Sequence, residues 1–404
     1  MTVELVYTPQ LAQYRLSETH PLRPERFVLA VELARAWGLI AETSANQSGR
    51  ARLVPPGPID DLDLLRVHDA SYIAAVRQAG AAPARWGGAF GIGPGDTPAF
   101  PRMHEISAEI AAATTRALAD VVDKRCLRAF SPAGGLHHAH RDHASGFCVY
   151  NDCAVAIARA TVEHHGLRVA YVDVDVHHGD GVQEAFYDRS DVLTVSVHES
   201  GSYLFPGTGR LAETGVGAGL GYAVNLPLPP GAGDEEYGMA FESVIAPAVR
   251  VFAPDVLLVQ LGADSHRDDP LADLATTVAG QYRMAQRLTG LADEMCGGRI
   301  AATGGGGYDS FSAVPRAWAC ALCALLGVPV PAELPEAWRA LAAEAAASAE
   351  TDEDASEGIA APIPRGTFDE RPEAPQPWGG DPLGETERAI IQLRASHPLL
   401  LEAG

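Results

Sequence analysis

Short apolar runs rich in β-branched residues alternate along the chain with longer segments of helical periodicity. The runs that predict strands span residues 4–7, 127–130, 168–174, 192–197, 222–226, 256–261 and 299–302. Helical patterns cover residues 24–40, 72–79, 106–123, 152–165, 235–252, 278–295 and 315–326. Strands that are apolar on both faces and separated by helices are typical of a parallel sheet buried between helical layers. We therefore expect an α/β fold with an open, mostly parallel sheet flanked by helices on both faces.

The pattern changes near residue 330. No break in composition comes before this point, so we expect residues 1–330 to form a single α/β domain. Residues 331–404 look like a C-terminal extension. It has an Ala/Glu-rich helix from residue 335, an acidic stretch at 350–354, a Pro-rich segment through residue 382 and a last helical pattern at 385–395. We expect this extension to pack on the domain or to be partly mobile.

Composition and charge exclude several classes of function. The formal net charge of -22, without any basic stripe, argues against binding of nucleic acid. It is compatible with cationic substrates such as lysine-bearing segments or polyamines. The N-terminus lacks the features of a secretion signal, and no apolar run is long enough to span a bilayer, so we expect a soluble, cytoplasmic protein. The six cysteines do not form a disulfide framework, and buried thiols are expected.

A cluster of charged residues follows the strand at 168–174. Asp175 and His177 are two residues apart, so on an extended strand they would share a face, where a carboxylate oxygen and an imidazole nitrogen can bind one cation. Asp173 and Asp180 remain to orient the ligands. Solvated loop charges are the alternative, but carboxylates this close to a buried strand favour a metal site.

Paired histidines follow the strand at 127–130. His137 and His138 stand on a Gly-rich loop and could serve a site as acid and base. Adjacent histidines can equally be surface or structural residues. Asp173 and Asp180 are available to orient them by accepting a hydrogen bond from each ring.

Two further strands end in polar residues. Asp264 follows the strand at 256–261 and brings another carboxylate to the same edge of the sheet, although it could also cap a helix. Tyr308 follows four glycines that lack the Gly-Lys-Ser/Thr ending of a phosphate loop. Such glycines let the backbone approach a site, and a tyrosine hydroxyl donates well to a developing oxyanion.

Together these clusters resemble the histone deacetylase family, and more particularly its bacterial branch, the acetoin-utilisation (AcuC-like) deacetylases. The resemblance extends from about residue 7 to residue 326. Its motifs, in chain order, are residues 20–26, 134–138, 145–148, 173–181, 205–209, 262–264 and 304–308. It implies the arginase/deacetylase fold and the activity of a zinc-dependent protein lysine deacetylase. The tail beyond residue 331 looks like the C-terminal extension of that bacterial branch.

The resemblance also implies which residues bind metal ions. Asp175, His177 and Asp264 would bind a catalytic Zn²⁺, with Fe²⁺ as an alternative because this ligand set is harder than the usual zinc set. A potassium ion would lie nearby, held by Asp173, Asp175, His177, Ser196 and Val197. A second monovalent site would involve Phe186, Val192 and Tyr222, with Arg189 where relatives often have a small hydroxyl residue.

The reaction implied by the resemblance is hydrolysis of an acetyl amide by a metal-activated water. His138, paired with Asp180, would act as general base and then as general acid. His137, paired with Asp173, would be its charged or hydrogen-bonding neighbour. Tyr308 would donate to the tetrahedral oxyanion.

The family binds its acetyl-lysine side chain in a narrow tunnel. By the resemblance, Gly146, Phe147 and Phe205 line this tunnel and Leu271 lies at its rim, although both phenylalanines could instead belong to the core. Apolar walls suit the four methylenes of a lysine stem. Asp96 matches the rim carboxylate that accepts hydrogen bonds from the substrate backbone, and as a lone loop aspartate it could equally form a turn.

Other functions remain as alternatives. An acetylpolyamine amidohydrolase would use the same chemistry on a small cation, but the apolar Leu271 favours acetyl-lysine in a protein or peptide. A ureohydrolase with two manganese ions would need further Asp and His ligands where this chain has His137, His138 and Tyr308. A non-enzymatic, metal-dependent binding module would be indicated by loss of a ligand or of Tyr308, and all are present. The bacterial relatives suggest an acyl-CoA synthetase as protein substrate, and we expect a monomer or homodimer.

Overall fold

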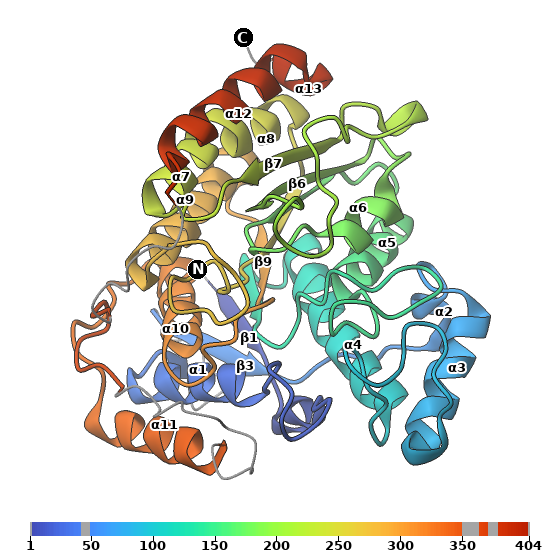
Figure 1. Ribbon diagram of the computed structural model, residues 1–404, viewed down its shortest axis with the longest axis vertical. Coiled ribbons are helices and arrows are strands. Elements are labelled where there is room, and N and C mark those ends of the chain that lie inside the picture. The colour runs from blue at the N-terminus through green and yellow to red at the C-terminus, as the bar shows by residue number, and fades with distance from the viewer. Residues whose placement is uncertain (1, 42–48, 350–362, 371–378, 403–404) are drawn as a thin grey trace.

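The computed structural model describes residues 2–41, 49–349, 363–370 and 379–402. Its centre is a nine-stranded sheet with the strand order β2-β3-β1-β4-β9-β8-β5-β6-β7 (Figure 1). Every neighbouring pair of these strands runs parallel. The strands are β1 (Val3–Val6), β2 (Ile40–Ala41), β3 (Ala51–Val54), β4 (Arg128–Ser131), β5 (Val169–Asp173), β6 (Val192–Glu199), β7 (Ala223–Leu228), β8 (Val256–Gln260) and β9 (Ile300–Thr303). The predicted open parallel sheet is confirmed.

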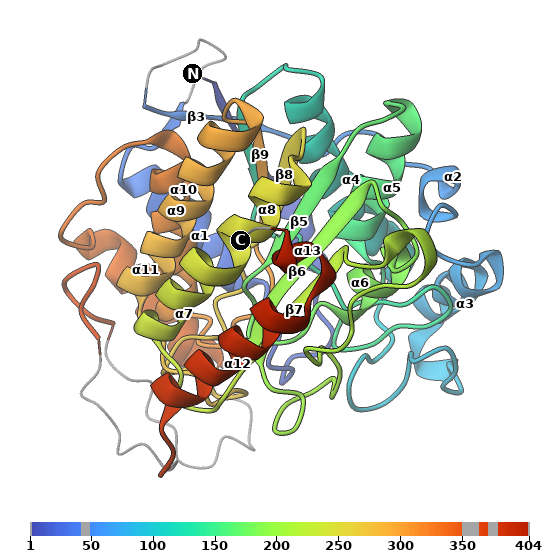
Figure 2. The same ribbon diagram turned by 90° about the horizontal axis from the view of Figure 1, so that it is seen from above.

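Two layers of helices cover the sheet. Helices α4 and α5, with α2, α3 and α6, lie on one side, whereas α1, α9 and α10, with α7 and α8, lie on the other (Figure 2). The helices are α1 (Glu25–Ala36), α2 (Asp61–Leu64), α3 (Ala70–Ala81), α4 (Met103–Val122), α5 (Asp152–Glu163), α6 (Asp180–Phe186), α7 (Asp234–Ala240), α8 (Ala246–Phe252), α9 (Val278–Cys296), α10 (Ala313–Leu326), α11 (Glu336–Ala349), α12 (Pro382–Ser396) and α13 (Pro398–Leu401). Short 3-10 turns occupy Pro9–Gln13, Pro83–Arg85 and Gly217–Gly219, and a π-helical turn, Phe241–Ile245, joins α7 to α8.

The seven predicted strands are all present, but β2 and β3 were not predicted. The helix expected over residues 24–40 ends at Ala36, and the chain then turns at Gly38, whose φ of 68° suits glycine, so that Ile40 enters β2. In β3 the charged Arg52 interrupts the apolar run. It lies directly opposite Glu4 on β1 and forms an ion pair with this buried carboxylate.

The register of the sheet brings four loops to one edge. Ser131, Thr303, Gln260 and Asp173 lie side by side at the carboxyl ends of β4, β9, β8 and β5. The loops that follow these strands carry the polar clusters noted in the sequence. Ligands of open α/β sheets bind at this edge.

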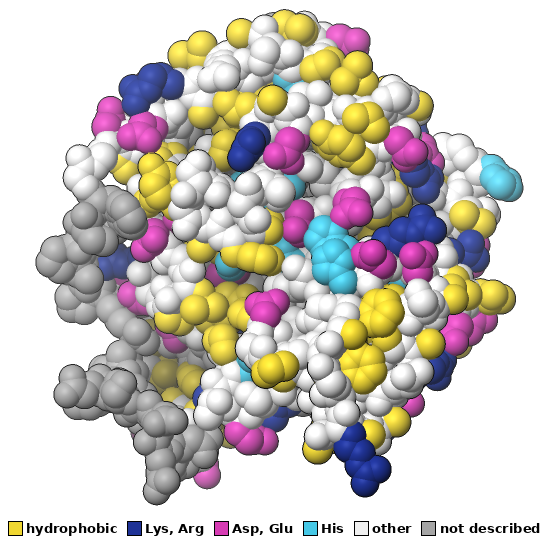
Figure 3. All heavy atoms as spheres, turned by 45° about the vertical axis from the view of Figure 1, so that its right-hand side comes forward, with side chains coloured by type: hydrophobic (Ala, Val, Ile, Leu, Met, Phe, Trp, Pro, Cys, Tyr) yellow, Lys and Arg dark blue, Asp and Glu magenta, His cyan; other side chains and the backbone are white. Residues whose placement is uncertain are grey.

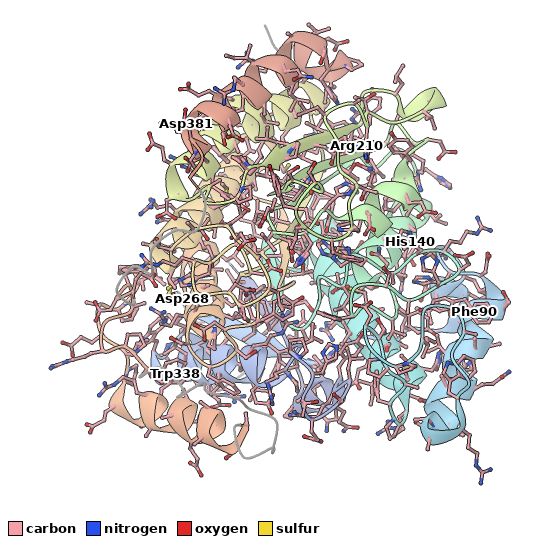
Figure 4. The ribbon with its side chains drawn as sticks, viewed as in Figure 1. Phe90, His140, Arg210, Asp268, Trp338 and Asp381 are labelled. Atoms are coloured by element: carbon pink, nitrogen blue, oxygen red, sulfur yellow. The ribbon has the colours of Figure 1, made fainter. Side chains whose placement is uncertain are left out.

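The C-terminal extension packs on the domain at two places. Trp338 of α11 is buried against α1, where its indole Nε1 donates a hydrogen bond to the carbonyl oxygen of Leu29 (2.9 Å). Helix α12 lies along β7 and α13 packs on α8, at the opposite side of the molecule from α11 (Figure 4, which labels Trp338 and Asp381). The acidic stretch at 350–354, and residues 371–378 of the Pro-rich segment, lie outside the described residues. The boundary near residue 330 stays a prediction.

All six cysteines are buried and unpaired, as expected. Within the described ranges, every helix is too short or too polar to cross a membrane. Acidic side chains are scattered over the face shown in Figure 3, among basic and histidine side chains, in keeping with the net charge of -22.

Candidate active site

Three donor atoms converge beyond the carboxyl ends of β5 and β8. The imidazole Nδ1 of His177 lies 3.0 Å from Asp264 Oδ2 and 3.2 Å from Asp175 Oδ1. All three side chains are buried. We expected extended backbone at Asp175 and His177, but β5 ends at Asp173, and both residues belong to the following loop. They still converge, because the His177 N–H donates to Asp175 Oδ1 (2.9 Å) and turns the loop back.

This donor set fits a divalent cation. Burial opposes a charge on His177, yet its hydrogen bonds to Asp175 and Asp264 raise the pKa of the imidazole to about 10. The pocket therefore favours positive charge where the three donors meet. Glycine keeps this space open, since a Cβ on Gly306 would lie 1.8 Å from Asp264 Oδ2. One imidazole and two carboxylates are suitable ligands for zinc or ferrous iron.

The oxygens of both carboxylates are oriented by further donors. Asp175 Oδ2 accepts hydrogen bonds from Gln260 Nε2 and from the Gly306 N–H, both at 2.7 Å. Asp264 Oδ1 accepts from the Val176 N–H (3.0 Å). Such partners fix the direction in which a ligand faces its metal.

Two histidine–aspartate pairs lie beside these donors. His137 Nδ1 lies 2.8 Å from Asp173 Oδ2, and His138 Nδ1 lies 2.7 Å from Asp180 Oδ1. Burial opposes a charge on His137, but Asp173 and the neighbouring carboxylates raise its pKa to about 9. For His138, burial and the adjacent His137 outweigh Asp180 and lower the pKa to about 3. The arrangement thus holds one charged and one neutral imidazole side by side, and the neutral one can accept a proton.

A third histidine, which was not predicted as part of the site, shares Asp180 with His138. His140 Nε2 lies 3.3 Å from Asp180 Oδ2, and its Nδ1 bonds to Glu184. The hydrogen bond with Asp180 raises the pKa of His140 to about 9 despite partial burial. His140, labelled in Figure 4, therefore connects Asp180 with the exposed Glu184.

The loop that carries the histidine pair is clamped by the first residues of α5. Asp152 accepts hydrogen bonds from the N–H groups of Gly135 (2.9 Å) and Leu136 (2.7 Å). Asn151 donates to the carbonyl oxygen of His137 (3.2 Å) while its own side-chain oxygen caps α5. The backbone on both sides of the histidine pair is therefore fixed to a helix.

Tyr308 lies on the loop after β9 and faces the same space. Its ring centroid is 5.8 Å from that of Phe147 and 6.5 Å from that of His177. The buried carboxylate of Asp269 accepts hydrogen bonds from the Tyr308 N–H (2.7 Å) and the Leu271 N–H (3.0 Å). Asp269 thus ties the tyrosine loop to the loop that carries the predicted rim residue.

Two aromatic rings flank the predicted catalytic side chains. Phe147 packs edge-on against His20 at 4.5 Å and against Tyr308. Phe205 is 46% exposed and packs edge-on against His138, with ring centroids 5.0 Å apart. Both phenylalanines lie on loops at the site, as the tunnel walls should, and Leu271 is 37% exposed.

Phe147 stands in a tight turn. Gly146 and Phe147 have φ values of 51° and 67°, and the flanking Ser145 and Cys148 exchange two backbone hydrogen bonds. A left-handed conformation is uncommon for a bulky residue. Asp96 supports this turn, because its exposed carboxylate accepts the Gly146 N–H at 2.8 Å. A Cβ on Gly146 would lie 2.4 Å from the His138 ring, so only glycine fits there.

The remaining predicted residues lie around this centre. Ser196 of β6 is directly opposite Asp173 in the ladder, and Val197 is buried beside it. Arg26, the last residue of the motif at 20–26, is fully buried, donates to the carbonyl oxygen of Gly307 (3.1 Å) and lies over the Trp318 ring. Near the predicted second monovalent site, Arg189 turns to Asp191 and lies over the Phe186 ring.

Sequence reasoning missed several supporting residues. Gln260, Asn151, Asp152, His140 and Asp269 each bond to a predicted site residue or to its loop. Two of them had a signal in the sequence, because the Asn-Asp pair opens the predicted helix at residue 152 and Gln260 ends an apolar strand just as Asp173 does. Asp269 and His140 had none, since their partners are brought together only by the fold.

Comparisons with known proteins agree with this geometry. A family model described as histone deacetylase domain matches residues 20–325. The acetoin utilization protein AcuC of Bacillus subtilis (strain 168) is 39% identical over 335 residues, which cover 82% of this chain and 84% of that protein. AcuC of Staphylococcus xylosus is 35% identical over 340 residues, covering 83% and 86%.

Solved structures give the same result. The crystal structure of an HDAC homolog from Aquifex aeolicus has a TM-score of 0.81 and 31% identity, covering 98% of this chain and 100% of that chain. An HDAC homolog complexed with SAHA has a TM-score of 0.82, with the same identity and coverage. These neighbours confirm the expected arginase/deacetylase fold.

Proposed function

The chain belongs to the histone deacetylase family of amidohydrolases, and we propose that it removes acetyl groups from the lysine side chains of proteins. One observation carries the proposal. The three converging donors Asp175, His177 and Asp264 lie next to the neutral His138 and face Tyr308 across one space. This combination supplies a cation site, a base and an oxyanion donor, which amide hydrolysis requires.

A divalent ion held by Asp175, His177 and Asp264 would lower the pKa of a water molecule and polarise the acetyl carbonyl. His138 accepts a proton at Nε2 and later returns it to the leaving amine, while Asp180 holds the opposite nitrogen. The raised pKa of His137 favours its charged form, which donates a hydrogen bond from Nδ1 to Asp173. Tyr308 donates its hydroxyl hydrogen to the developing oxyanion.

The substrate side chain enters between the two aromatic walls. Phe147 and Phe205 offer apolar contact to the four methylenes of a lysine stem, and Leu271 extends this apolar surface to the rim. Asp96 carries the rim carboxylate, where it both supports the Phe147 turn and presents an exposed oxygen to the substrate backbone. An apolar rim favours an acetyl-lysine peptide over a free polyamine.

We assign zinc or ferrous iron to the catalytic position, with potassium at Asp173, Asp175, His177, Ser196 and Val197. The ladder pairing of Asp173 with Ser196 supports the potassium assignment, because it places two of these residues directly opposite each other on neighbouring strands. The protein substrate that we propose is an acetylated acyl-CoA synthetase in the cytoplasm, since the AcuC relatives are named for acetoin utilization.

The test compares hydrolysis of an acetyl-lysine peptide and of an acetylated polyamine. The protein is stripped with a chelator and reloaded with Zn²⁺, or with Fe²⁺ under anaerobic conditions. We expect no turnover by the stripped protein and a higher kcat/KM for the peptide after reloading. A higher kcat/KM for the polyamine would instead assign the chain as an acetylpolyamine amidohydrolase.

The metal content separates the remaining alternatives. About one divalent ion per chain fits a deacetylase, whereas two would indicate the two-metal chemistry of a ureohydrolase. Metal binding without hydrolysis of either substrate would leave a metal-dependent binding module.

The proposed protein substrate is tested separately. An acetylated acyl-CoA synthetase is incubated with the reloaded protein, and its deacetylation is followed by mass spectrometry.

A further inference from the structure

A segment of the C-terminal extension, residues 363–370, reaches the active-site side of the domain; we call it the strap. Thr367 is buried, and its N–H and hydroxyl donate to the carbonyl oxygens of Ala332 (2.9 Å) and Pro331 (2.6 Å). The buried guanidinium of Arg316 on α10 donates to the carbonyl oxygens of Thr367 (3.1 Å) and Asp369 (2.7 Å). The strap is therefore fixed on its inner side by several hydrogen bonds.

The last residue of the strap joins three parts of the domain. Glu370 Oε1 accepts the N–H of Val278, the first residue of α9, at 2.9 Å. Its Oε2 lies 3.0 Å from His266 Nε2 and 3.8 Å from the Arg316 guanidinium. His266 and Arg316 are buried, and the Glu370 side chain is only 13% exposed.

The His266–Glu370 contact is a hydrogen bond and not a second metal site, although Asp268 also lies within ligand distance. His266 Nδ1 accepts the Asp268 N–H (3.1 Å), so the ring proton is on Nε2 and points to Glu370. A metal ion would need that nitrogen without its proton. The neighbouring Arg316 cation also opposes a metal ion.

His266 belongs to the loop that supplies the active site. Asp264, a predicted metal ligand, is two residues before it. Asp269, which holds the Tyr308 and Leu271 N–H groups, follows three residues after it and donates its own N–H to the His266 carbonyl oxygen (2.9 Å). Figure 4 labels Asp268 on this loop. A single histidine thus connects the strap with the metal ligand, the tyrosine loop and the rim.

We propose that Glu370 is a positioning residue of the active site, which acts through His266 to hold the loop of Asp264 and Asp269 in its metal-binding position. The C-terminal extension would thus contribute one residue, Glu370, to the support of the active-site loop. The proposal rests on the proposed function only in taking Asp264 as a metal ligand.

The test measures binding of Co²⁺, whose absorption bands report the geometry of its ligands, by the metal-free full-length protein. In Glu370→Gln an NH2 group replaces one of the two carboxylate oxygens. Either the Val278 N–H or the His266 Nε2–H then faces a donor, and one buried donor is left without an acceptor. We expect the Kd for Co²⁺ to rise about tenfold, the lower end of the range for residues that orient metal ligands. His266→Gln, which removes the other partner, should weaken binding in the same direction.

Glu333→Gln is the matched control, because Glu333 lies on the same extension but pairs with Arg365 where both side chains are largely exposed. It should bind Co²⁺ as the wild type does. Unchanged Kd values and absorption spectra in folded Glu370→Gln and His266→Gln would overturn the proposal, and if Glu370→Gln does not fold, His266→Gln decides. Wild-type protein that binds Co²⁺ but cleaves no acetylated peptide would refute the proposed function, while the Kd comparison would still decide the role of Glu370.

Discussion

The two paired imidazoles at the site differ in charge although their partners are alike. Each has its Nδ1 bonded to an aspartate, which leaves Nε2 for the reaction. His137 lies near several carboxylates, whereas His138 has the charged His137 as its neighbour, with ring centroids 4.0 Å apart. Position within the cluster, and not residue type, therefore makes His138 the proton acceptor.

Tyr308→Phe removes a single hydroxyl group from this space. The ring contact with Phe147 and the N–H bond to Asp269 remain, so the fold and the metal content should not change. We expect kcat for an acetyl-lysine peptide to fall by about two to three powers of ten, as for loss of one oxyanion donor. Steady-state kinetics and the thermal midpoint measure the two effects. Tyr282→Phe on α9 is the control, and a similar kcat for Tyr308→Phe and the wild type would contradict the role of Tyr308.

His140→Gln should move the pH profile. A charged His140 beside Asp180 disfavours a second charge on His138, so its removal raises the pKa of His138. Activity is lost as the base becomes protonated, and the acid limb of kcat/KM should therefore shift to higher pH, by about half a unit to one unit. The kcat/KM of the variant and of the wild type is measured as a function of pH, over the pH range in which both proteins stay folded.

His143→Gln provides the control for this shift. Its ring stacks on that of His140 with centroids 4.5 Å apart, but it bonds to Asp142 and not to Asp180. The acid limb of this variant should stay in place. If both variants shift equally, a general loss of surface charge and not the Asp180 contact is responsible.

At the level of elements, the N-terminus of α5 decides the shape of the histidine loop. Asp152→Asn replaces one acceptor oxygen by a donor opposite the N–H groups of Gly135 and Leu136. One buried backbone donor loses its acceptor, so the free energy of unfolding should fall by about 1–3 kcal/mol, and kcat should fall with it. Urea denaturation and peptide kinetics measure both. Asp381→Asn is the control, since Asp381 caps α12 at an exposed position where asparagine caps equally well.

The apolar pattern predicted most elements because their burial follows directly from local sequence. The four strands that end at the site are buried at every position, and β5, β8 and β9 are apolar up to their last residue. By contrast, β2 has only two residues, β3 contains Arg52, and α6 begins at Asp180 among glycines that look like a turn. These elements depend on partners distant in the sequence, such as Glu4 opposite Arg52.

The residues of the candidate site that directly follow strands could be predicted from the sequence, as most of the strands could. Asp175, His177, Asp264 and the histidine pair follow strands, and parallel strands bring their carboxyl ends together. Residues that act on them from elsewhere, such as Asp269 and Glu370, have no pattern of their own. Glu370 lies more than a hundred residues from its partner His266 in a stretch that looks like a linker, so only the folded chain shows the contact.

At the scale of the whole molecule, the C-terminal extension covers an edge strand of the sheet. β7 is the last strand of the sheet, and an uncovered edge strand offers unpaired backbone groups to other chains. Helix α12 lies along it (Figure 2), α13 packs on α8, and His397 Nε2, between the two helices, donates to the carbonyl oxygen of Ala223 (2.8 Å). The extension therefore covers a sheet edge at one end, while its strap supports the active-site loop at the other.

Removal of residues 381–404 should expose this edge. The deletion takes away four buried apolar side chains, Ile390, Leu393, Leu399 and Leu400. Since each contributes about 2 kcal/mol when fully buried, we expect a clearly lower thermal midpoint, and self-association through β7 in light scattering after gel filtration. His397→Ala keeps the helices but loses the bond to Ala223, so it should cost about 1 kcal/mol and keep the oligomeric state of the full chain. A truncated chain with the thermal midpoint and oligomeric state of the full protein would show that β7 needs no cover, because the edge strand would then be stable without α12 and α13.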